Sequence, residues 1–426
     1  MNNKTIFSER GMSLYGWVIV AVSILVMIGL GGAELSFGVF LKPIQEEFGW
    51  TRTMVSGAVS IVEGVCGLVG IVIGRLADKH GPRMTIAICA LIGGLGCLLM
   101  SQTRSLWQLY LYFGVMVGVS MAGWIPVFAA VSRRFVDKRV LALGITSSGI
   151  TIGQMFLPPV LAYFIISYEW RLAFVILAVI VWVSAIPALI LLEKNPPQGR
   201  RVLCDNWNER DRTEHKGRRL TEPRQYAVTE AVKMVQFWML IITGFVIAVG
   251  FFVVVIHIVA YGTDIGIPTT SAALILTIMS IANILGKLLV APLAIKVGGR
   301  FTLFLLLALQ ALALFLLMWA SNLWMLFALA AVFGFGSGAT SPIRMSMIPE
   351  FFGVRSVGAI MGTVGVAWAV GGITGPILAG YIFDVSRSYD MAFLAGGLLL
   401  IIGMATTYFL KVPKVSDGSL EGGGND

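Results

Sequence analysis

Apolar stretches of about 20 residues recur along the whole chain, and each is bounded by charged residues, Pro or Gly. A hydrocarbon core about 30 Å thick requires roughly 20 apolar residues in a helix that rises 1.5 Å per residue. The pattern therefore predicts membrane-spanning helices and not the shorter amphipathic helices of a soluble core. The predicted spans are residues 14–40, 53–77, 84–101, 106–131, 140–166, 171–191, 236–262, 269–294, 301–319, 323–347, 356–382 and 391–410.

The predicted helices fall into two sets of six around one long polar stretch. We expect an N-terminal six-helix bundle in residues 1–192, a cytoplasmic linker in residues 193–235, a C-terminal six-helix bundle in residues 236–412 and a disordered tail in residues 413–426. The linker mixes basic and acidic residues, which is typical of a flexible tether. The predicted fold class is an all-α membrane protein with twelve transmembrane helices in two bundles.

The composition excludes a water-soluble globular protein, because 57% of the residues are hydrophobic, 12% are charged and the mean hydropathy is +0.87. Three of the four cysteines lie in apolar runs and the fourth lies in the linker, so their spacing predicts neither a disulfide framework nor a metal site. The sequence has no Walker motif, nucleophile triad or paired metal ligands. We expect a protein that is not an enzyme and that uses no cofactor and no metal.

The formal net charge of +9 comes from basic residues in the loops between the apolar runs. With the N-terminus in the cytoplasm, 25 of the 31 Lys and Arg residues lie on the inner side, five lie outside and Lys287 lies within a helix. This bias predicts that both termini are cytoplasmic, and it argues against nucleic-acid binding. Short loops and the lack of a targeting extension favour the inner (plasma) membrane of a prokaryotic cell.

The two predicted bundles carry an internal repeat. Residues 74–83 (GRLADKHGPR) and residues 291–300 (APLAIKVGGR) each close a predicted helix, 217 residues apart. Two shorter matches, at offsets of 216 and 219, pair residues 135–139 with 351–355 and residues 173–174 with 392–393. Such a duplication predicts two bundles related by an axis along the membrane normal, the arrangement of carriers whose site lies at the midplane between the halves.

Over nearly its whole length the chain resembles a major facilitator superfamily transporter. The loop signature G-x-x-x-D-x-x-G-x-R of that family is found on Gly74, Asp78, Gly81 and Arg83. The resemblance implies a gating role for these residues, in which Asp78 bridges basic groups of a neighbouring helix end in one conformation. The second copy has Ile295 in place of the acid, so we expect this latch on one side only.

Two segments narrow the resemblance to a group of subfamilies. Residues 15–18 (YGWV) and 36–42 (SFGVFLK) are similar to the first helix of monocarboxylate and oxalate/formate carriers, and residues 142–145 with the pair at 158–159 are similar to their fifth helix. The resemblance implies alternating-access transport of a small organic anion, such as lactate or pyruvate, together with a proton.

An ionisable group at the bilayer centre costs about 2.5–3.5 kcal/mol and therefore requires a partner or a function. Lys287 shares a helix face with Asn283, one turn earlier, and lies about 13 Å deeper than Lys296. A buried ammonium that faces a cavity is suited to an anion. The resemblance aligns Lys287 with a carboxylate-binding Arg and Asn283 with an Asp of monocarboxylate carriers. Alternatively, the Lys287 side chain snorkels, so that its ammonium lies at the inner membrane interface.

Glu63 lies about 16–18 Å from either flank of its predicted helix, at the greatest depth of any ionisable residue. A buried acid that keeps its proton near neutrality is suited to proton coupling, although it could equally hold neighbouring helices together. Glu34 lies eight residues before Lys42, which predicts a position near the outer mouth. A gating role and simple contact with solvent both fit this position, and we expect contact with solvent.

Three further polar residues lie within the predicted spans. His257, with Tyr261 one turn away, is a substrate-binding or proton-carrying residue or else an interfacial one. Gln154 lies mid-span and is either a hydrogen-bond donor to substrate or a helix-packing residue.

These features predict a monomeric secondary carrier whose partners are a small organic anion, a proton and the lipid bilayer. One alternative keeps the fold and exports drugs or other organic solutes. A second alternative is a uniporter or an anion exchanger without proton coupling, because Asn283 replaces the expected acid. A membrane-embedded enzyme or sensor finds no support in the sequence.

Overall fold

The computed structural model describes residues 3–134, 139–192, 226, 228–352 and 357–410. In these ranges twelve helical spans are long and apolar enough to cross a membrane, which confirms the predicted fold class. The spans of the N-terminal half are α1 (Asn3–Leu35) continued by α2 (Phe37–Phe48), α3 (Arg52–His80), α4 (Pro82–Met100), the run of α5 (Leu106–Leu109), η1 (Tyr110–Val117), α6 (Gly118–Met121) and α7 (Trp124–Arg134), then α8 (Arg139–Ser167) and α9 (Trp170–Leu191).

The C-terminal half begins with a short helix and continues with six spans. They are α11 (Val228–Ala231), α12 (Val235–Asp264), α13 (Thr269–Val297), α14 (Gly299–Leu317), α15 (Leu323–Phe352), α16 (Val357–Ser386) and α17 (Asp390–Phe409). Most helix ends lie within one or two turns of the predicted ones. Residues 193–225, 227 and 411–426 of the predicted linker and tail lie outside the described residues, so the predicted domain bounds stay a prediction. The described end of the linker contains α11, which contacts α16.

The first span extends beyond its predicted end at residue 40. Pro43 lies inside α2, and a proline normally ends or kinks a helix because it lacks the amide hydrogen. Here Leu41 and Ile44 are fully buried and α2 packs against α12, so tertiary packing maintains the helix as far as Phe48.

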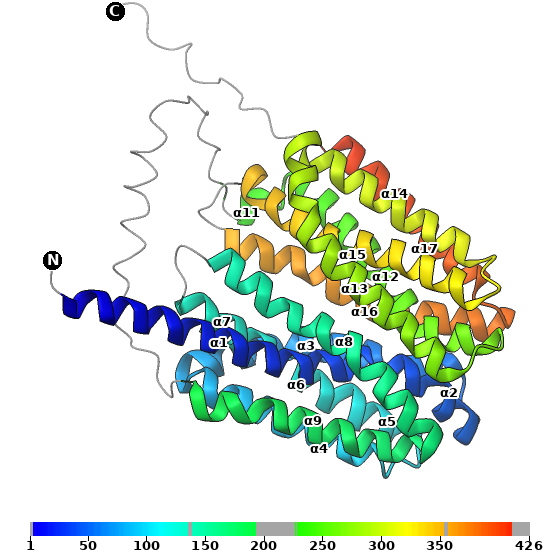
Figure 1. Cartoon of the computed structure of the whole chain (residues 1–426). Coiled ribbons are helices and arrows are strands. Elements are labelled where there is room, and N and C mark those ends of the chain that lie inside the picture. Colours follow the sequence, from blue (N-terminus) through cyan, green and yellow to red (C-terminus); the bar gives the residue numbers. More distant parts are fainter. Residues whose placement is uncertain (1–2, 135–138, 193–225, 227, 353–356, 411–426) are drawn as a thin grey trace, which may run out of the picture.

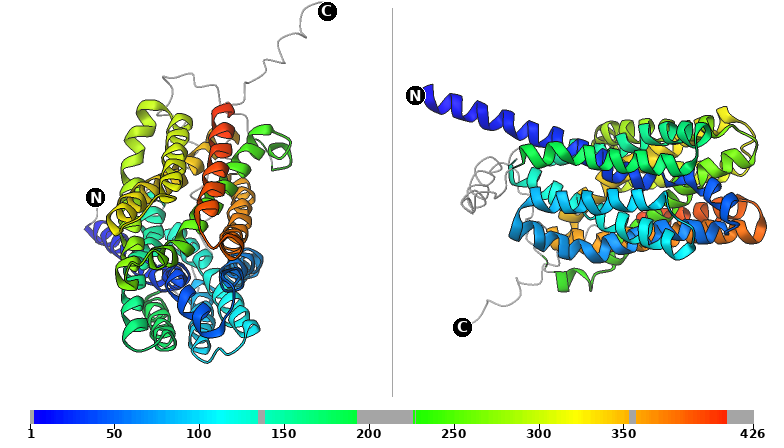
Figure 2. Two further views of the ribbon diagram at one scale, coloured as in Figure 1. Left: turned by 90° about the vertical axis from the view of Figure 1, so that its right-hand side faces the viewer. Right: turned by 90° about the horizontal axis from the view of Figure 1, so that it is seen from below.

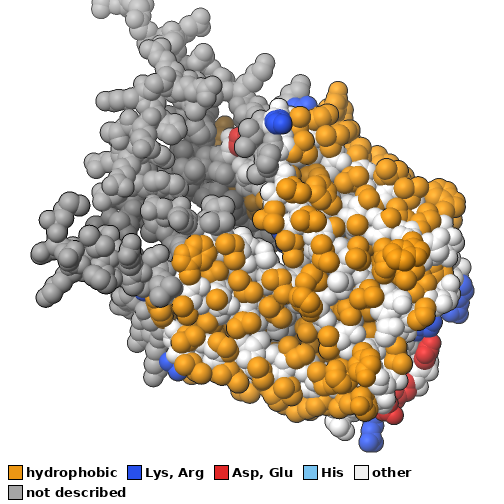
Figure 3. All heavy atoms as spheres, in the orientation of Figure 1, with side chains coloured by type: hydrophobic (Ala, Val, Ile, Leu, Met, Phe, Trp, Pro, Cys, Tyr) orange, Lys and Arg blue, Asp and Glu red, His pale blue; other side chains and the backbone are white. Residues whose placement is uncertain are grey.

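The two halves lie one beside the other, as Figures 1 and 2 show. We name the end at which α1 begins, α9 ends, α12 begins and α17 ends the terminal face, and the opposite end the distal face. Helix α3 packs on α16, α8 packs on α13 and α2 packs on α12 across the boundary between the halves. Hydrophobic side chains cover most of the flank seen in Figure 3, with charged side chains gathered toward its ends.

The internal repeat is visible in the helix boundaries themselves. Helices α3 and α13 both have 29 residues and α4 and α14 both have 19, and each pair starts 217 residues apart. The glycine between the helices adopts the same unusual backbone conformation in both copies, with φ 84° at Gly81 and φ 86° at Gly298. Only glycine takes up such angles without strain. The duplication predicted from sequence is therefore confirmed.

Candidate functional site

Lys287 lies on α13 at the boundary between the two halves. Its ammonium donates a hydrogen bond of 3.1 Å to the Thr151 hydroxyl, which belongs to α8 of the N-terminal half. The side chain is half-buried, and no ion pair joins it to another side chain in the described part of the chain. A hydroxyl leaves the charge of Lys287 unneutralised, so this position can accept an anion.

Asn283, which was predicted to share a helix face with Lys287, contacts a different helix. Its amide donates a 3.0 Å hydrogen bond to Ser337 Oγ on α15, whereas Lys287 bonds to α8. The close packing explains this: a Cβ added at Gly338 would collide with the Asn283 backbone, and one added at Gly286 would collide with the backbone of α15. Sequence spacing placed the two side chains on one helix face, and the structure gives them separate partners.

Gln154 lies on α8 three residues after Thr151, and therefore on the same face of that helix. The side chain is buried, and its amide nitrogen has no hydrogen-bond partner in the part of the chain that the structure describes. The adjacent carbonyl of Met155 accepts a 2.6 Å hydrogen bond from Thr277 of α13, which fixes α8 against α13 here. A buried donor without an acceptor costs free energy, so this position also favours a polar or anionic ligand.

Two carboxyl groups meet near the centre of the bundle. The side chains of Glu34 on α1 and Glu63 on α3 share a hydrogen bond. Glu34 is 2% exposed, so the prediction that it lies in solvent near the outer mouth is wrong. The reason is the extra length of the first span: α2 ends 14 residues after Glu34, which places it about 21 Å from that end.

Glu63 also touches the opposite half. A Cβ added at Gly372 of α16 would lie 2.6 Å from Glu63 Cγ and 3.0 Å from the ring of Phe252 on α12. Phe252 and Phe251 pack in turn on Trp368. The acid therefore lies against a glycine and an aromatic cluster at the boundary between the halves.

The distal face is closed by a network around Arg52, the first residue of α3. Its guanidinium donates to Tyr389 Oη at 2.6 Å and pairs with both oxygens of Asp264, at 2.6 and 2.8 Å. It also bonds Gln45 at 3.0 Å and lies 3.5 Å from the centre of the Phe383 ring. The predicted span of residues 53–77 leaves Arg52 in the loop before it, yet Arg52 is 3% exposed and joins the two halves.

Asp384 also contributes to the closure of the distal face, because it bonds the N-terminus of α3. Its carboxylate accepts hydrogen bonds of 2.9 Å from the backbone nitrogens of Arg52 and Thr53 and one of 2.5 Å from the Thr53 hydroxyl. A carboxylate at a helix N-terminus is stabilised by the helix dipole. The acid of α16 thus caps a helix of the opposite half, a contact that no local sequence signal announces.

His257 belongs to this distal network and not to the surroundings of Lys287. It is fully buried, with Nε2 3.1 Å from the Pro376 carbonyl and Nδ1 3.0 Å from Tyr389 Oη. The carbonyl can only accept, so Nε2 carries a hydrogen and Nδ1 can accept from the tyrosine while Arg52 donates to the tyrosine oxygen. Burial raises the pKa of Tyr389, so its hydroxyl remains a donor at neutral pH. Both ring nitrogens of His257 are therefore occupied.

Tyr261 is also fully engaged within its own half. Its hydroxyl hydrogen is shared between the carbonyls of Leu317 and Ala320, at 2.9 and 3.0 Å, where α14 ends. The ring packs against Phe393. In this conformation Tyr261 ties α12 to the end of α14, and the structure does not bring it to Lys287.

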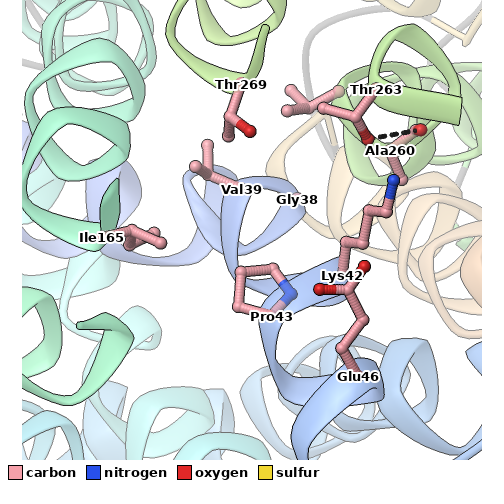
Figure 4. A pocket seen from close by; sticks show the side chains of 10 residues that line it. Gly38, Val39, Lys42, Pro43, Glu46, Ile165, Ala260, Thr263 and Thr269 are labelled. Carbon is pink, nitrogen blue, oxygen red and sulfur yellow. Dashed lines mark hydrogen bonds between the residues drawn. The ribbon is translucent and has the colours of Figure 1, made fainter. Parts of the chain in front are cut away.

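A small pocket opens at the distal face between the halves. It has a volume of about 190 Å³, and Figure 4 shows Lys42 and Glu46 of α2 among its walls. The Lys42 ammonium lies 3.5 Å from Asp264, so the pocket adjoins the Arg52 network. Its lining residues are Gly38, Val39, Lys42, Pro43, Glu46, Ile165, Val259, Ala260, Thr263 and Thr269.

The distance between α3 and α16 increases from the distal face toward the terminal face. Toward the distal face a Cβ at Gly380 would lie 2.9 Å from Thr53, and near the middle one at Gly67 would lie 3.5 Å from Ala369 Cβ. Closer to the terminal face, a Cβ at Gly365 or Gly362 would meet no atom within 4 Å. The two helices therefore touch from the distal face to the middle, and α16 faces open space beyond.

The predicted gating residues lie at the terminal end of α3. Gly74 faces Ile125 of its own half, Gly81 forms the turn between α3 and α4, and Arg83 is half-buried at the start of α4. The side chain of Asp78 lies outside the described residues, so the predicted latch stays a prediction.

A family model described as Major Facilitator Superfamily matches residues 19–272 and 240–424 of the chain. The chain belongs to the Major Facilitator Superfamily. This multi-pass membrane transporter is 28% identical over 397 residues to "Monocarboxylate transporter 13" of Rattus norvegicus, covering 91% of this chain and 87% of the relative. It is 25% identical over 418 residues to "Monocarboxylate transporter 12" of Mus musculus, covering 94% and 86%.

A solved structure with the same fold is that of a bacterial homolog of the human lysosomal transporter Spinster, in an inward-facing and occupied conformation. It superposes on this transporter with a TM-score of 0.71 at 16% identity, covering 92% of this chain and 96% of that chain. The superposition confirms the predicted fold, in agreement with the repeat and the twelve spans.

Proposed function

We propose that this transporter moves a small monocarboxylate, such as lactate or pyruvate, together with a proton by alternating access. The observation that carries the proposal is the ammonium of Lys287, which lies between the halves and whose one hydrogen-bond partner among the described residues is the hydroxyl of Thr151. A carboxylate supplies the charge that the hydroxyl lacks. The similarity to proteins named monocarboxylate transporters supports the same substrate class.

Substrate binding at Lys287 would connect the two halves. The ammonium belongs to the C-terminal half, and the donors Thr151 and Gln154 lie on α8 of the N-terminal half. An anion bridging these groups would satisfy the unpartnered Gln154 amide and neutralise Lys287 at once. Asn283 would contribute by holding α13 against α15.

The coupled proton would reside on Glu63, which contacts α16 across the boundary between the halves. His257 is the less favoured carrier, because both of its ring nitrogens are engaged in the distal network. Tyr261 is likewise less favoured as a substrate ligand, because its hydroxyl bonds the end of α14.

The positive-inside rule supports an orientation with the terminal face in the cytoplasm and the distal face outside. In this orientation the described conformation is closed to the outside, and Gly74, Asp78, Gly81 and Arg83 would form the cytoplasmic gate of the other conformation. We propose that the transporter is a monomer in the inner (plasma) membrane. The two halves that move against each other would be residues 1–192 and 236–412.

The test is uptake of radiolabelled L-lactate into proteoliposomes with and without an inward proton gradient. Lys287→Ala should lower uptake by about ten- to a hundred-fold, the equivalent of the roughly 1.5–3 kcal/mol that a hydrogen bond to a charged group contributes. Lys296→Ala, on the exposed end of the same helix, is the matched control and should transport like the wild type. Absence of lactate uptake by a folded wild-type protein would overturn the proposal.

A second candidate, export of larger apolar solutes, is favoured by the aromatic cluster of Phe251, Phe252 and Trp368 beside Glu63. In that case hydrophobic compounds would compete for transport and Lys287→Ala would leave their export intact. An anion exchanger would take up lactate only in exchange for an anion inside the proteoliposomes, and its uptake rate would not respond to the proton gradient.

A further inference from the structure

The contact between Glu34 and Glu63 requires a proton. Two ionised carboxylates have only acceptor oxygens, so a hydrogen bond between them exists only if one of the two is protonated. Two negative charges in hydrogen-bond contact inside a protein also repel strongly, which favours the pair with one proton. The observed contact is therefore that of two carboxyl groups with one proton between them.

Among the residues that the structure describes, no cation compensates the charge of the pair. The titratable group that faces it from α3 is the thiol of Cys66, which in turn lies near the thiol of Cys89 on α4 and bonds the indole of Trp124 on α7. From the opposite half the pair meets Gly372 of α16 and the ring of Phe252 on α12. In the described part of the chain no Lys, Arg or His forms an ion pair with either acid.

The Oε1 atom of Glu34 is also informative. It is buried and has no partner among the hydrogen bonds of the described residues. An unpaired acceptor on a buried carboxylate costs free energy, whereas a water molecule would satisfy it. The pair is therefore able to exchange its proton whenever water reaches it.

We infer that Glu34 and Glu63 together form one proton-binding site at the boundary between the halves, in which a single proton is shared by two carboxyl groups. This inference rests on the proposed function, because it names the site at which the coupled proton is held. It differs from the sequence-based hypothesis of a lone Glu63, since it makes Glu34 an equal partner.

The position of the pair explains how the proton would be coupled to conformation. Glu63 packs on Gly372, so movement of α16 away from α3 exposes the pair to water, and return of α16 excludes water again. A pair that has lost its proton carries two charges and is unfavourable against the apolar surface of α16. Loss of the proton therefore favours separation of the two helices, and its return favours closure.

The decisive experiment compares two transport modes in Glu34→Gln and Glu63→Gln. Glutamine has the same shape as a protonated glutamate and can donate to the remaining carboxylate, so each variant should resemble a pair that never releases its proton. Accumulation of lactate driven by a proton gradient should fall by about ten-fold or more in both variants. Counterflow, in which external lactate exchanges with internal lactate, needs no proton release and should persist. Glu169→Gln, an exposed acid between α8 and α9, is the control and should keep both modes.

Normal gradient-driven accumulation by either Gln variant would overturn the shared site. A wild-type protein that shows neither accumulation nor counterflow of lactate would instead overturn the proposed function, and the pair is then tested without substrate. Infrared difference spectra of the detergent-purified protein report the carbonyl stretch of protonated carboxyl groups. If the proton is shared, Glu63→Gln removes or shifts the carbonyl band of the protonated pair, and Glu34→Gln shifts the same band. A carbonyl band that is unchanged in Glu34→Gln would show that Glu63 alone holds the proton and would refute the inference.

Discussion

Individual residues of the same type have different roles in this transporter because their neighbours differ. Lys287 and Arg52 are both cations at the boundary between the halves. Arg52 is neutralised by Asp264 and bonded to Tyr389 and Gln45, whereas the described residues offer Lys287 a single hydroxyl. The first arrangement closes a face, and the second leaves a charge available for a ligand.

His257 provides a test at the scale of one residue. We expect His257→Ala to lower the thermal stability by about 1–3 kcal/mol, because it removes the hydrogen bond to the Pro376 carbonyl and leaves the hydroxyl hydrogen of Tyr389 without its acceptor. Gradient-driven lactate accumulation, normalised to folded protein, should persist. Tyr389→Phe, which removes the hydroxyl from the same bond, should have a similar effect on the melting temperature. A His257→Ala variant of normal stability that exchanges lactate but cannot accumulate it would identify His257 as the proton carrier instead.

The sequence revealed which buried residues are chemically unusual but not how they pair. Depth and charge alone single out Lys287 and Glu63, because each lies far from the ends of an apolar run. The partners Thr151, Glu34 and Tyr389 lie between 29 and 136 positions away in the chain, and their contacts depend on helix rotation and register that apolar periodicity does not determine. Glu34 was misplaced because a proline inside α2 concealed the true length of the first span.

At the scale of the elements, the central contact is the one between α3 and α16. It is built on small residues: Gly64 and Gly67 of α3 face Ile373 and Ala369, and Gly372 of α16 faces Glu63. Small residues allow helix backbones to approach closely within a membrane. The contact positions Glu63 and also limits how far the two helices can slide past each other.

Filling this contact should impair transport without unfolding the protein. A methyl group at Gly372 would lie 2.6 Å from Glu63 Cγ, so Gly372→Ala must displace the acid or the helix, at a cost of about 1–3 kcal/mol. We expect a several-fold lower rate of lactate uptake. Gly250→Ala, whose Cβ would lie in ordinary contact 3.5 Å from Leu400 within one half, is the matched control. Equal uptake rates in the two variants would show that the close approach of α3 and α16 is not needed for function.

At the scale of the whole molecule, the architecture could be predicted from the sequence. The number of spans, the two halves and the duplication followed from apolar runs and a fixed offset, because the bilayer sets helix length and a repeated sequence repeats its turns. The conformational state did not follow. Closure of the distal face depends on Arg52, Asp264 and Asp384 meeting across the boundary, and these residues lie at three separate helix ends.

Locking the two halves together tests alternating access directly. A Cβ at Gly67 would lie 3.5 Å from Ala369 Cβ, within the range that a disulfide requires, and the two helices belong to different halves. In a protein whose native cysteines are replaced by serine, oxidation of Gly67→Cys/Ala369→Cys should abolish lactate transport, and reduction should restore it. Gly262→Cys/Ala272→Cys, with a separation of 3.2 Å inside the C-terminal half, should transport in both states. Undiminished transport by the oxidised inter-half pair would exclude rocking of the halves about this contact.

The shared proton of Glu34 and Glu63 has a consequence for the electrical behaviour of the carrier. With one proton the pair has a charge of minus one, which balances the plus one of Lys287. A monocarboxylate and the shared proton bring equal and opposite charges, so these groups have the same sum, minus one, in the loaded carrier and in the carrier that has released both, and a full cycle moves no net charge. A transmembrane voltage exerts about 2.3 kcal/mol per elementary charge per 100 mV only on charge that moves. Such a carrier would respond to the chemical gradient of protons and be indifferent to the membrane potential.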